Sequence, residues 1–292
     1  MKYQLTHRTS YAYGSSVDSA QHIAHLRPRA FRGQTVEAIG IETNPVPAMA
    51  VSHLDHFGNN IDIYRIDKPH TRFEIEVRAV LDVRFPDPPP AGETPPWEDL
   101  RAALSGGGFP LAVEASELVH ESPLVPEVEA LRDYAAPCFT PGRPILEAAR
   151  ELTSRIKDDF EYHPGATDIS TPLDEVFTGK AGVCQDFAHV EIAALRAHGL
   201  AAGYVSGYIR TVRSKDEVGL RGADASHAWV AVWCGPEAGW VHLDPTNDLM
   251  AKEDHVVLAW GRDFSDVSPL RGVILGGDSH SYGVAVTLLP VV

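Results

Sequence analysis

The stretch of sequence that decides the fold is Gly182-Val183-Cys184-Gln185-Asp186-Phe187-Ala188-His189. From Phe187 to His198 apolar residues recur every three or four positions, which predicts a helix that Gly199 would end. Cys184 then lies at the N-terminus of this helix, beside unpaired backbone N–H groups and the positive end of the helix dipole. Both favour the thiolate, which is the nucleophilic form of cysteine. The pattern therefore makes Cys184 a candidate nucleophile.

A histidine and a carboxylate follow downstream in matching contexts. His227 begins, and Asp244 ends, a short apolar run rich in Val and Trp, and such runs predict strands. The segment 234–239 between them carries turn residues, so an antiparallel hairpin would put both side chains at its open end. Counted along a five-residue loop, Asp244 falls nearer Val230 than His227. A bulge or a longer loop would then be needed to bring the pair opposite each other.

These three residue types suit acyl transfer. The imidazole of His227 would take the proton of Cys184 and later deliver it to a leaving amine. Asp244 would accept a hydrogen bond from the other ring nitrogen, which fixes the tautomer and stabilises the imidazolium. The backbone N–H of Cys184 would serve as an oxyanion donor, and the sequence identifies no second donor.

The motifs around these residues, with Tyr204-Val205-Ser206-Gly207-Tyr208 between them, resemble the bacterial transglutaminase-like family of the transglutaminase/papain-like thiol superfamily. The resemblance covers nearly the whole chain. Tyr3 to Pro28 resembles the β-rich N-terminal domain often fused to this core, and 261–272 resembles the family's C-terminal signature. Gly203 and Ala231 depart from common family residues and weaken any inference about substrate.

The resemblance implies an α+β, papain/transglutaminase-like core with the cysteine on a central helix and an antiparallel sheet carrying His and Asp. Alternating strands within 1–85 predict an antiparallel β-sandwich ahead of it. Residues 86–96 are proline-rich and predict a stiff linker. We assign 97–292 to the catalytic domain, with its core at about 145–270. The late strand 283–289 could join either sheet.

Composition excludes several classes of function. The net charge is −15 with a pI near 5.3, which argues against binding of nucleic acid or anionic membranes. Three cysteines do not make a disulfide framework, and no run is long enough to span a membrane. The N-terminus lacks an apolar signal core, so we expect a cytoplasmic protein; its oligomeric state stays open.

Three further residues are candidates for the substrate pocket. Asp186 suits a first-turn carboxylate that complements the helix dipole better than a catalytic role. Gln185 could orient substrate or form the pocket wall. Trp229 could pack the hairpin or line the cleft beside His227. The chain has neither a Cys-x-x-Cys nor a His-x-x-x-His pair on one helical face, and no calcium loop, so we expect no metal and no cofactor.

Three functions remain compatible with this pattern. An amidase or peptidase would pass the acyl group of a thioester on Cys184 to water, whereas a true transglutaminase would pass it to an amine. A non-catalytic peptide-binding module is the third, and the complete set of Cys184, His227 and Asp244 argues against it. We favour the amidase or peptidase, acting on a peptide or protein amide.

Overall fold

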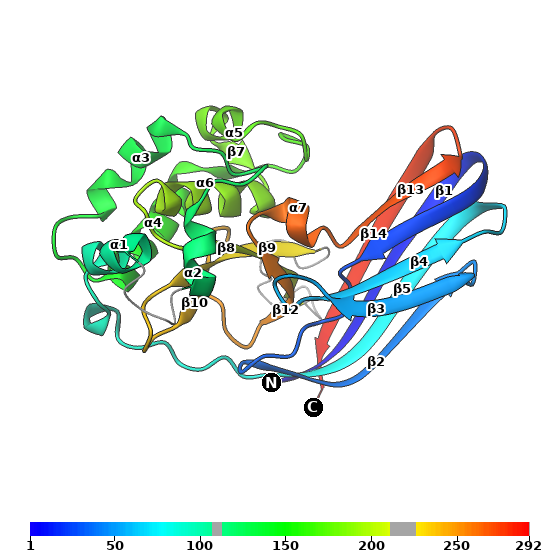
Figure 1. The fold of residues 1–292 in the computed structure, drawn as a ribbon, viewed down its shortest axis with the longest axis horizontal. Coiled ribbons are helices and arrows are strands. Elements are labelled where there is room, and N and C mark those ends of the chain that lie inside the picture. The colour runs from blue at the N-terminus through cyan, green and yellow to red at the C-terminus, as the bar shows by residue number, and fades with distance from the viewer. Residues whose placement is uncertain (107–112, 211–225, 292) are drawn as a thin grey trace, which may run out of the picture.

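The computed structural model describes residues 1–106, 113–210 and 226–291. A long β-sheet lies beside a body of helices packed on a second sheet (Figure 1). Among the described residues, no helix is both long enough and apolar enough to cross a membrane.

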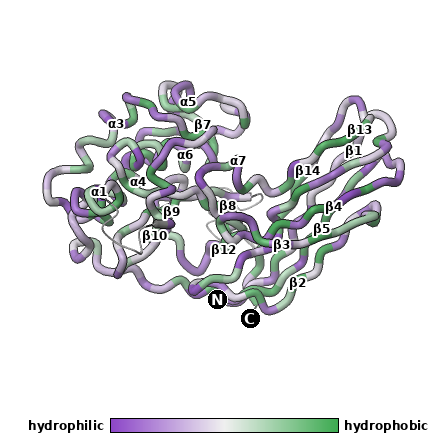
Figure 2. The backbone as a smooth tube through the Cα atoms, in the orientation of Figure 1, coloured by the Kyte–Doolittle hydropathy of each residue, from purple (hydrophilic) through white to green (hydrophobic). Residues whose placement is uncertain are grey.

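The first sheet has seven strands, which are β1 (Lys2–Ala24), β2 (Gln34–Asn44), β3 (Met49–Leu54), β4 (Asn60–Ile66), β5 (His70–Val83), β13 (Leu270–Gly276) and β14 (His280–Pro290). In β5, buried residues alternate with more exposed ones along most of the strand, as the sequence pattern predicts. Hydropathy alternates in the same way (Figure 2).

The long strand β1 belongs to both halves of this sheet. Its first half pairs with β5 as far as Ala12 and with β14 as far as Tyr13. Its second half pairs with β13 from Val17 and with β4 from Ala20, and Val17 also pairs with His70 of β5. The halves face each other, since His22 of the second half stacks on Phe73 of β5 with ring centroids 4.2 Å apart. The predicted sandwich is therefore one antiparallel sheet folded over on itself.

The last two strands pair with β1, although the sequence division assigned 97–292 to the catalytic domain. β13 lies along Val17 to Ala24, and β14 lies along Tyr3 to Tyr13. The long β1 needs partners on both edges, and the C-terminal hairpin supplies them on one side. The chain thus leaves the first sheet and returns to it.

The second body is α+β, as predicted. Its sheet has the order β11-β10-β9-β8-β12, and every pairing in it is antiparallel. These strands are β8 (Ala202–Ile209), β9 (His227–Trp233), β10 (Trp240–Asp244), β11 (Leu249–Met250) and β12 (His255–Gly261), and a short parallel pair is β6 (Glu161–Tyr162) with β7 (Ala181–Gly182). Both β8 and β9 are buried along their whole length.

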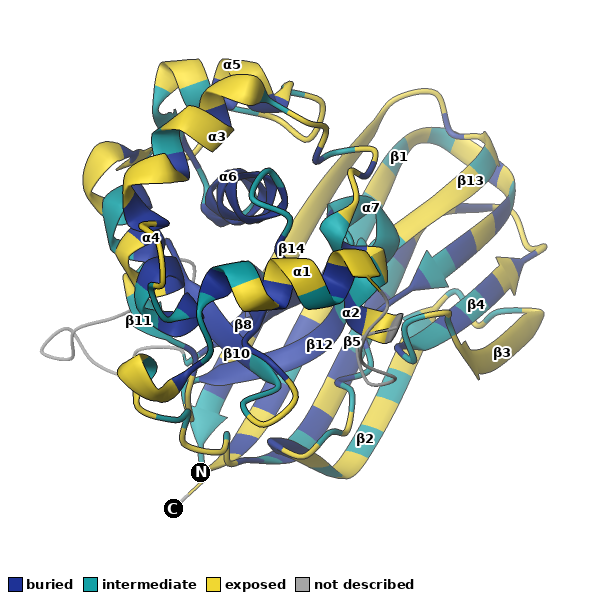
Figure 3. Cartoon of the chain, turned by 60° about the vertical axis from the view of Figure 1, so that its left-hand side comes forward, coloured by how far each residue is buried: buried dark blue, intermediate teal, exposed yellow. Residues whose placement is uncertain are grey.

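Helices cover this sheet, and α6 (Cys184–Arg196) is the central one. Every residue of α6 except Gln185 is buried, and the helix lies among the others (Figure 3). The remaining helical segments are η1 (Ala91–Glu93), α1 (Trp97–Gly106), α2 (Val113–Ser116), η3 (Glu117–Val119), α3 (Glu129–Ala135), η4 (Ala136–Cys138), α4 (Ile145–Asp159), α5 (Leu173–Gly179) and α7 (Phe264–Val267). As predicted, Gly199 follows the end of α6, with a φ of 75°.

Side-chain amides join the two bodies along the free edge of β12. Gln34 accepts from the Val257 N–H at 2.9 Å and donates to the Val257 carbonyl at 2.8 Å. Asn59 does the same for Trp260, at 2.9 and 2.8 Å. Each amide thus takes the place of a neighbouring strand, so the edge is not left with unpaired backbone groups.

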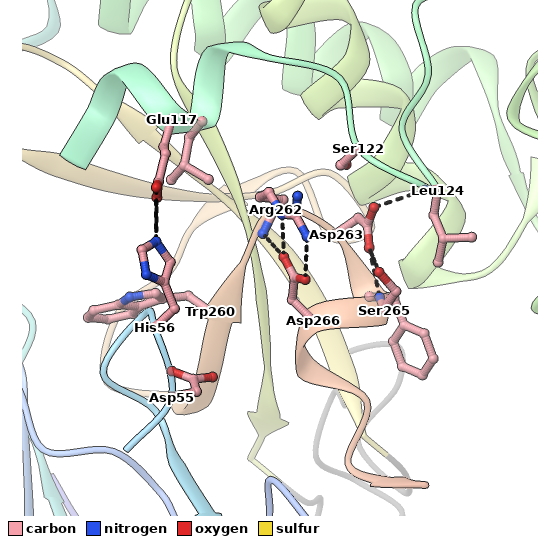
Figure 4. Close-up of polar contacts among 12 residues, drawn as sticks. Asp55, His56, Glu117, Ser122, Leu124, Trp260, Arg262, Asp263, Ser265 and Asp266 are labelled. Carbon is pink, nitrogen blue, oxygen red and sulfur yellow. Dashed lines mark hydrogen bonds and ion pairs between the residues drawn. The ribbon is translucent and has the colours of Figure 1, made fainter. Parts of the chain in front are cut away.

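Residues 261–272, which resemble the family's C-terminal signature, stabilise this region of the structure (Figure 4). The Asp263 carboxylate caps α7 by accepting from the Ser265 N–H at 2.8 Å, and it accepts from the Leu124 N–H at 2.9 Å. Nearby, His56 of the first body pairs with Glu117 of the second at 2.9 Å. The contacts of Asp263 fix the start of α7, and the pair of His56 with Glu117 connects a loop of the first body to η3 of the second.

Candidate active site

Cys184 is the first residue of α6 and is 9% exposed. The Asp186 carboxylate accepts from the Val183 N–H at 2.8 Å and from the Thr167 hydroxyl at 2.6 Å, which holds the helix start in place. Burial raises the pKa of this carboxyl. A Cβ at Gly182 would lie 2.5 Å from Asp186 Oδ2, so the motif requires glycine there. Asp186 lies in the first turn of α6, where the sequence placed it, and its complementing of the helix dipole stays a prediction.

His227 and Asp244 meet across a hairpin with no bulge in its register, and the connection 234–239 is one residue longer than the five-residue loop counted from the sequence. Leu243 pairs with Val230 and His242 with Ala231, so this register, continued, puts Asp244 opposite Trp229. His227 is two residues from that position and therefore on the same face of the sheet. Its ring reaches diagonally across the hairpin, and Nε2 lies 2.9 Å from Asp244 Oδ2.

The Asp244 carboxylate accepts five hydrogen bonds from described residues. Oδ1 accepts from the backbone N–H groups of Thr246 and Asn247 at 2.9 and 3.2 Å. Oδ2 accepts from His227, from the Asn247 side chain at 2.8 Å, and from His255 Nε2 at 3.2 Å. Burial alone would raise the pKa of Asp244, but His227 and His255 hold it far below its ordinary value.

The charge of His227 is set by two neighbours. Burial alone would lower the pKa of this ring, but the Asp244 carboxylate and the Cys184 sulfur outweigh it and raise the pKa. Nε2 of His227 is hydrogen-bonded to Asp244. Nδ1 of His227 has no hydrogen bond of good geometry within the described part of the chain. The ring nitrogen left for the thiol is therefore Nδ1. This arrangement suits an imidazolium between a carboxylate and a thiolate.

Tyr204 completes the immediate surroundings of the thiol. Its side chain is 2% exposed, and burial, Cys184 and Asp186 together raise the pKa of its phenol well above the ordinary value. The phenol therefore stays protonated near the sulfur. The sequence motif contained this tyrosine without indicating that position.

The other pocket candidates lie in different surroundings. Trp229 is fully buried, and its Nε1–H donates to His242 Nδ1 at 3.0 Å, so it supports the hairpin from within and does not line an open cleft. Gln185 is partly exposed next to Cys184 and is available to a substrate.

His255 is the residue that sequence reasoning missed. It begins β12, is 1% exposed, and contacts Asp244. A histidine opening the otherwise apolar run His255–Trp260 is a signal that could have raised the question. Its distance from Asp244 depends on strand order, which the sequence pattern did not predict.

A cavity of about 1500 Å³ lies between the two bodies. Aromatic residues line part of its wall, including Phe31, Phe85 and Trp260. Cys184, His227 and Asp244 do not line it. We place the candidate active site at the three side chains, because the cysteine in the cavity wall, Cys234, is fully buried and burial raises the pKa of its thiol.

One group of metal-ligating side chains comes together in the described ranges. Ligand atoms of His227, Asp244 and His255 lie within 4.8 Å of one another, and all three residues are buried. The hydrogen bonds from both rings to the Asp244 carboxylate account for this proximity. The absence of a metal stays a prediction.

Comparison with known proteins agrees with this fold. A model described as the bacterial transglutaminase-like N-terminal region matches residues 3–82, and one described as the transglutaminase-like superfamily matches residues 132–245. An uncharacterized protein of Mycobacterium tuberculosis is 39% identical over 99% of this chain and 93% of its own length. One from Mycobacterium leprae is 30% identical over 98% and 97%.

Two further matches are more distant. A protein-glutamine gamma-glutamyltransferase of Pseudomonas aeruginosa is 28% identical over 41% of this chain and 18% of its own length. The structure of "a Putative Cysteine Protease from Cytophaga hutchinsonii" has a TM-score of 0.75 and 20% identity, over 99% of this chain and 90% of that one. This second likeness shows a shared fold. The chain belongs to the bacterial transglutaminase-like family, a family of cysteine-dependent enzymes, as the motifs predicted.

Proposed function

We propose that the protein is a cysteine-dependent acyl-transfer enzyme that cleaves amide bonds through a thioester on Cys184. One observation carries this proposal. The ring of His227 is held at Nε2 by the Asp244 carboxylate, 2.9 Å away, and interacts with the sulfur of Cys184 at the N-terminus of α6. A base, its orienting carboxylate and a nucleophile therefore occur together in a buried site.

The first half of the reaction forms the thioester. His227 Nδ1 takes the thiol proton, and the thiolate of Cys184 attacks the amide carbonyl carbon. The negative charge moves to the carbonyl oxygen, where the backbone N–H of Cys184 at the helix N-terminus stabilises it. The imidazolium then protonates the amide nitrogen, the C–N bond breaks, and the amine leaves. Asp244 stays ionised throughout, because its hydrogen bonds hold its pKa low.

The second half releases the acyl group. His227, now neutral, takes a proton from a water molecule, whose oxygen attacks the thioester carbonyl. The C–S bond breaks, the carboxylic acid leaves, and the thiol is restored with the proton from the imidazolium. Gln185, partly exposed beside the sulfur, is positioned to contact the acyl side of a peptide or protein substrate.

An amine could replace water in that second half. The Pseudomonas aeruginosa relative described as a protein-glutamine gamma-glutamyltransferase favours this alternative. Transfer to an amine requires the site to exclude water from the thioester, whereas hydrolysis requires no such device. We therefore propose hydrolysis as the main reaction and a transglutaminase as the second candidate. Ammonia release from a glutamine peptide, measured with and without a fluorescent amine, separates the two.

The test of the nucleophile needs no known substrate. We expect iodoacetamide to alkylate Cys184 rapidly below pH 7 in the wild type and much more slowly in His227→Ala, because the imidazolium stabilises the thiolate. Mass spectrometry identifies the modified cysteine. Cys138 and Cys234 serve as internal controls, since both are fully buried and burial raises the pKa of each thiol. A rate indifferent to His227 would contradict the proposal.

Turnover supplies the second test. On any amide substrate found by screening, Cys184→Ala should lose at least about 1000-fold in kcat, because the covalent route is gone. Cys138→Ala is the matched control and should keep the wild-type rate. Circular dichroism should show both variants folded, as the lost volume is small. Full activity in Cys184→Ala would remove the mechanism.

A further inference from the structure

A second histidine shares the carboxylate oxygen that orients His227. Asp244 Oδ2 lies 2.9 Å from Nε2 of His227 and 3.2 Å from Nε2 of His255. Since an ionised carboxylate only accepts, each ring must bring its proton on Nε2. The nitrogen that remains on each neutral ring is Nδ1. In His227 that nitrogen is left for the thiol, whereas in His255 it has no partner among the described residues.

The ring of His255 reaches Asp244 from another strand. β8 and β9 lie between β12, which carries His255, and β10, which carries Asp244. Gly207 of β8 makes room on this face, because a Cβ there would lie 2.4 Å from the Trp229 ring. Trp229 in turn supports His255 edge-to-face, with ring centroids 5.1 Å apart. Because Gly207 has no side chain and Trp229 packs against His255, the His255 ring has room to extend across this face of the sheet toward Asp244.

Packing alone gives no reason for a histidine at this position. The side chain is 1% exposed, and its unpartnered Nδ1 carries a desolvation cost that a phenyl ring of similar size would avoid. What the histidine gains for this desolvation cost is the hydrogen bond from its Nε2 to Asp244. The orientation of an aspartate carboxylate about its last torsion is broad, so its hydrogen bonds decide which way each oxygen points.

We propose that His255 is a positioning residue of the active site. It donates from Nε2 to Asp244 Oδ2 and holds that oxygen where it meets Nε2 of His227. The ring of His227 is thereby held with its Nε2–H on Asp244 and its Nδ1 toward Cys184. This inference rests on the proposed function, because it assigns His255 a role through Asp244 and His227.

The test compares variants at position 255 that keep or remove the donor. His255→Phe keeps a ring and removes the donor, whereas His255→Gln keeps a donor at the distance of Nε2. His255→Asn is polar but too short to reach the carboxylate, so it replaces the phenylalanine variant if that one does not fold. His242→Asn is the matched control, since His242 is buried two residues from Asp244 and has no hydrogen bond to it in the described chain.

Two measurements report the position of the proton. The first is the rate of Cys184 alkylation by iodoacetamide from pH 5 to 9, and the second is the pair of ring ¹⁵N shifts of His227. We expect His255→Phe, or His255→Asn, to slow alkylation at pH 6 about tenfold and to shift the His227 signals from those of an imidazolium toward those of a neutral ring. His255→Gln and His242→Asn should match the wild type in both.

The outcomes separate this inference from the proposed function. If His227→Ala slows alkylation and His255→Phe does not, His255 has no positioning role and the proposed function stands. Equal losses in the Phe and Gln variants would also overturn the inference, because packing and not the donor would then matter. If His227→Ala itself has no effect, the proposed function fails first.

Discussion

Two buried histidine clusters in this chain have opposite electrostatics. At the junction of the two bodies, His7 contacts the Thr9 hydroxyl at 2.7 Å and the Tyr208 hydroxyl at 2.8 Å. In the active site, His227 contacts the Asp244 carboxylate at 2.9 Å. Burial lowers the pKa of His7 to about 4, whereas Asp244 and Cys184 reverse the effect of burial and raise the pKa of His227.

The difference teaches that burial does not decide the charge of a histidine by itself. Hydroxyl groups can satisfy both nitrogens of a neutral ring, so the cluster at His7 needs no charge. A buried carboxylate needs a cation or several donors, and the active site supplies both kinds of partner. The first cluster joins the two bodies with a neutral ring, and the second has the carboxylate partner that a charged ring requires.

The largest expected effect comes from removing the carboxylate charge beside His227, so that this histidine has only neutral partners, as His7 has. Asp244→Asn removes the carboxylate charge and offers an amide that can fix the wrong tautomer, so kcat should fall by about 1000-fold or more. The measurement is kcat at pH 7 on a screened amide. Asp248→Asn is the matched control, because Asp248 is exposed and its φ of 53° suits asparagine equally well. An unchanged rate would exclude Asp244 from the catalytic set.

Gly207, which packs against Trp229 beside the histidine cluster of the candidate active site, should not tolerate a larger side chain. In Gly207→Ala the new Cβ would lie 2.2 Å from the Val256 carbonyl oxygen and 2.4 Å from the Trp229 ring. Because backbone must move, we expect a loss of more than about 3 kcal/mol in the free energy of unfolding, measured in urea. Gly40→Ala, in open space on β2, is the control and should change little. Equal free energies of unfolding for Gly207→Ala and Gly40→Ala would show that the backbone at Gly207 shifts without cost.

At the junction of the two bodies, the amide of Gln34 should matter for stability. Gln34→Ala leaves the N–H and carbonyl of Val257 without their partner in a buried place, which should cost about 2 kcal/mol. Urea unfolding of the variant measures this cost. Gln21→Ala is the control, because Gln21 is exposed on the same sheet. A loss no larger than that of the control would mean that water replaces the amide.

The smallest effect concerns pH and the neutral histidine. The pKa of His7 is about 4 in the folded chain against 6.5 ordinarily, so below pH 6.5 the unfolded state binds a proton that the folded state does not. Stability should therefore fall as pH drops from 6.5 toward 4. His7→Gln cannot take part in this loss and should lose roughly 2 kcal/mol less than the wild type between pH 7 and pH 4.5.

Urea unfolding at the two pH values measures this difference, with His280→Gln as an exposed control. His22 and His189 also have pKa values near 4, lowered by burial, so part of the acid sensitivity should remain in His7→Gln. The same pH loss in His7→Gln as in the wild type would show that His7 does not titrate in this way.

Local patterns predicted a large part of the structure. The spacing of apolar residues identified α6, α4 and the hairpin of β9 and β10, because each depends on neighbours a few residues away. The motifs also indicated Cys184, His227 and Asp244 as one group. Register was predicted less well, since a count of loop residues did not anticipate the diagonal contact between His227 and Asp244.

By itself, the sequence determined the family and the helix that begins at Cys184, and it indicated the candidate nucleophile, because these depend on residue types at fixed local spacing. Only the tertiary structure decided that β13 and β14 return to β1, and that His255 reaches Asp244 across two strands. Both depend on strand order, which is set when distant segments bury their faces together. The protonation of each buried histidine was decided in the same way, because it follows from the neighbour that folding brings to the ring.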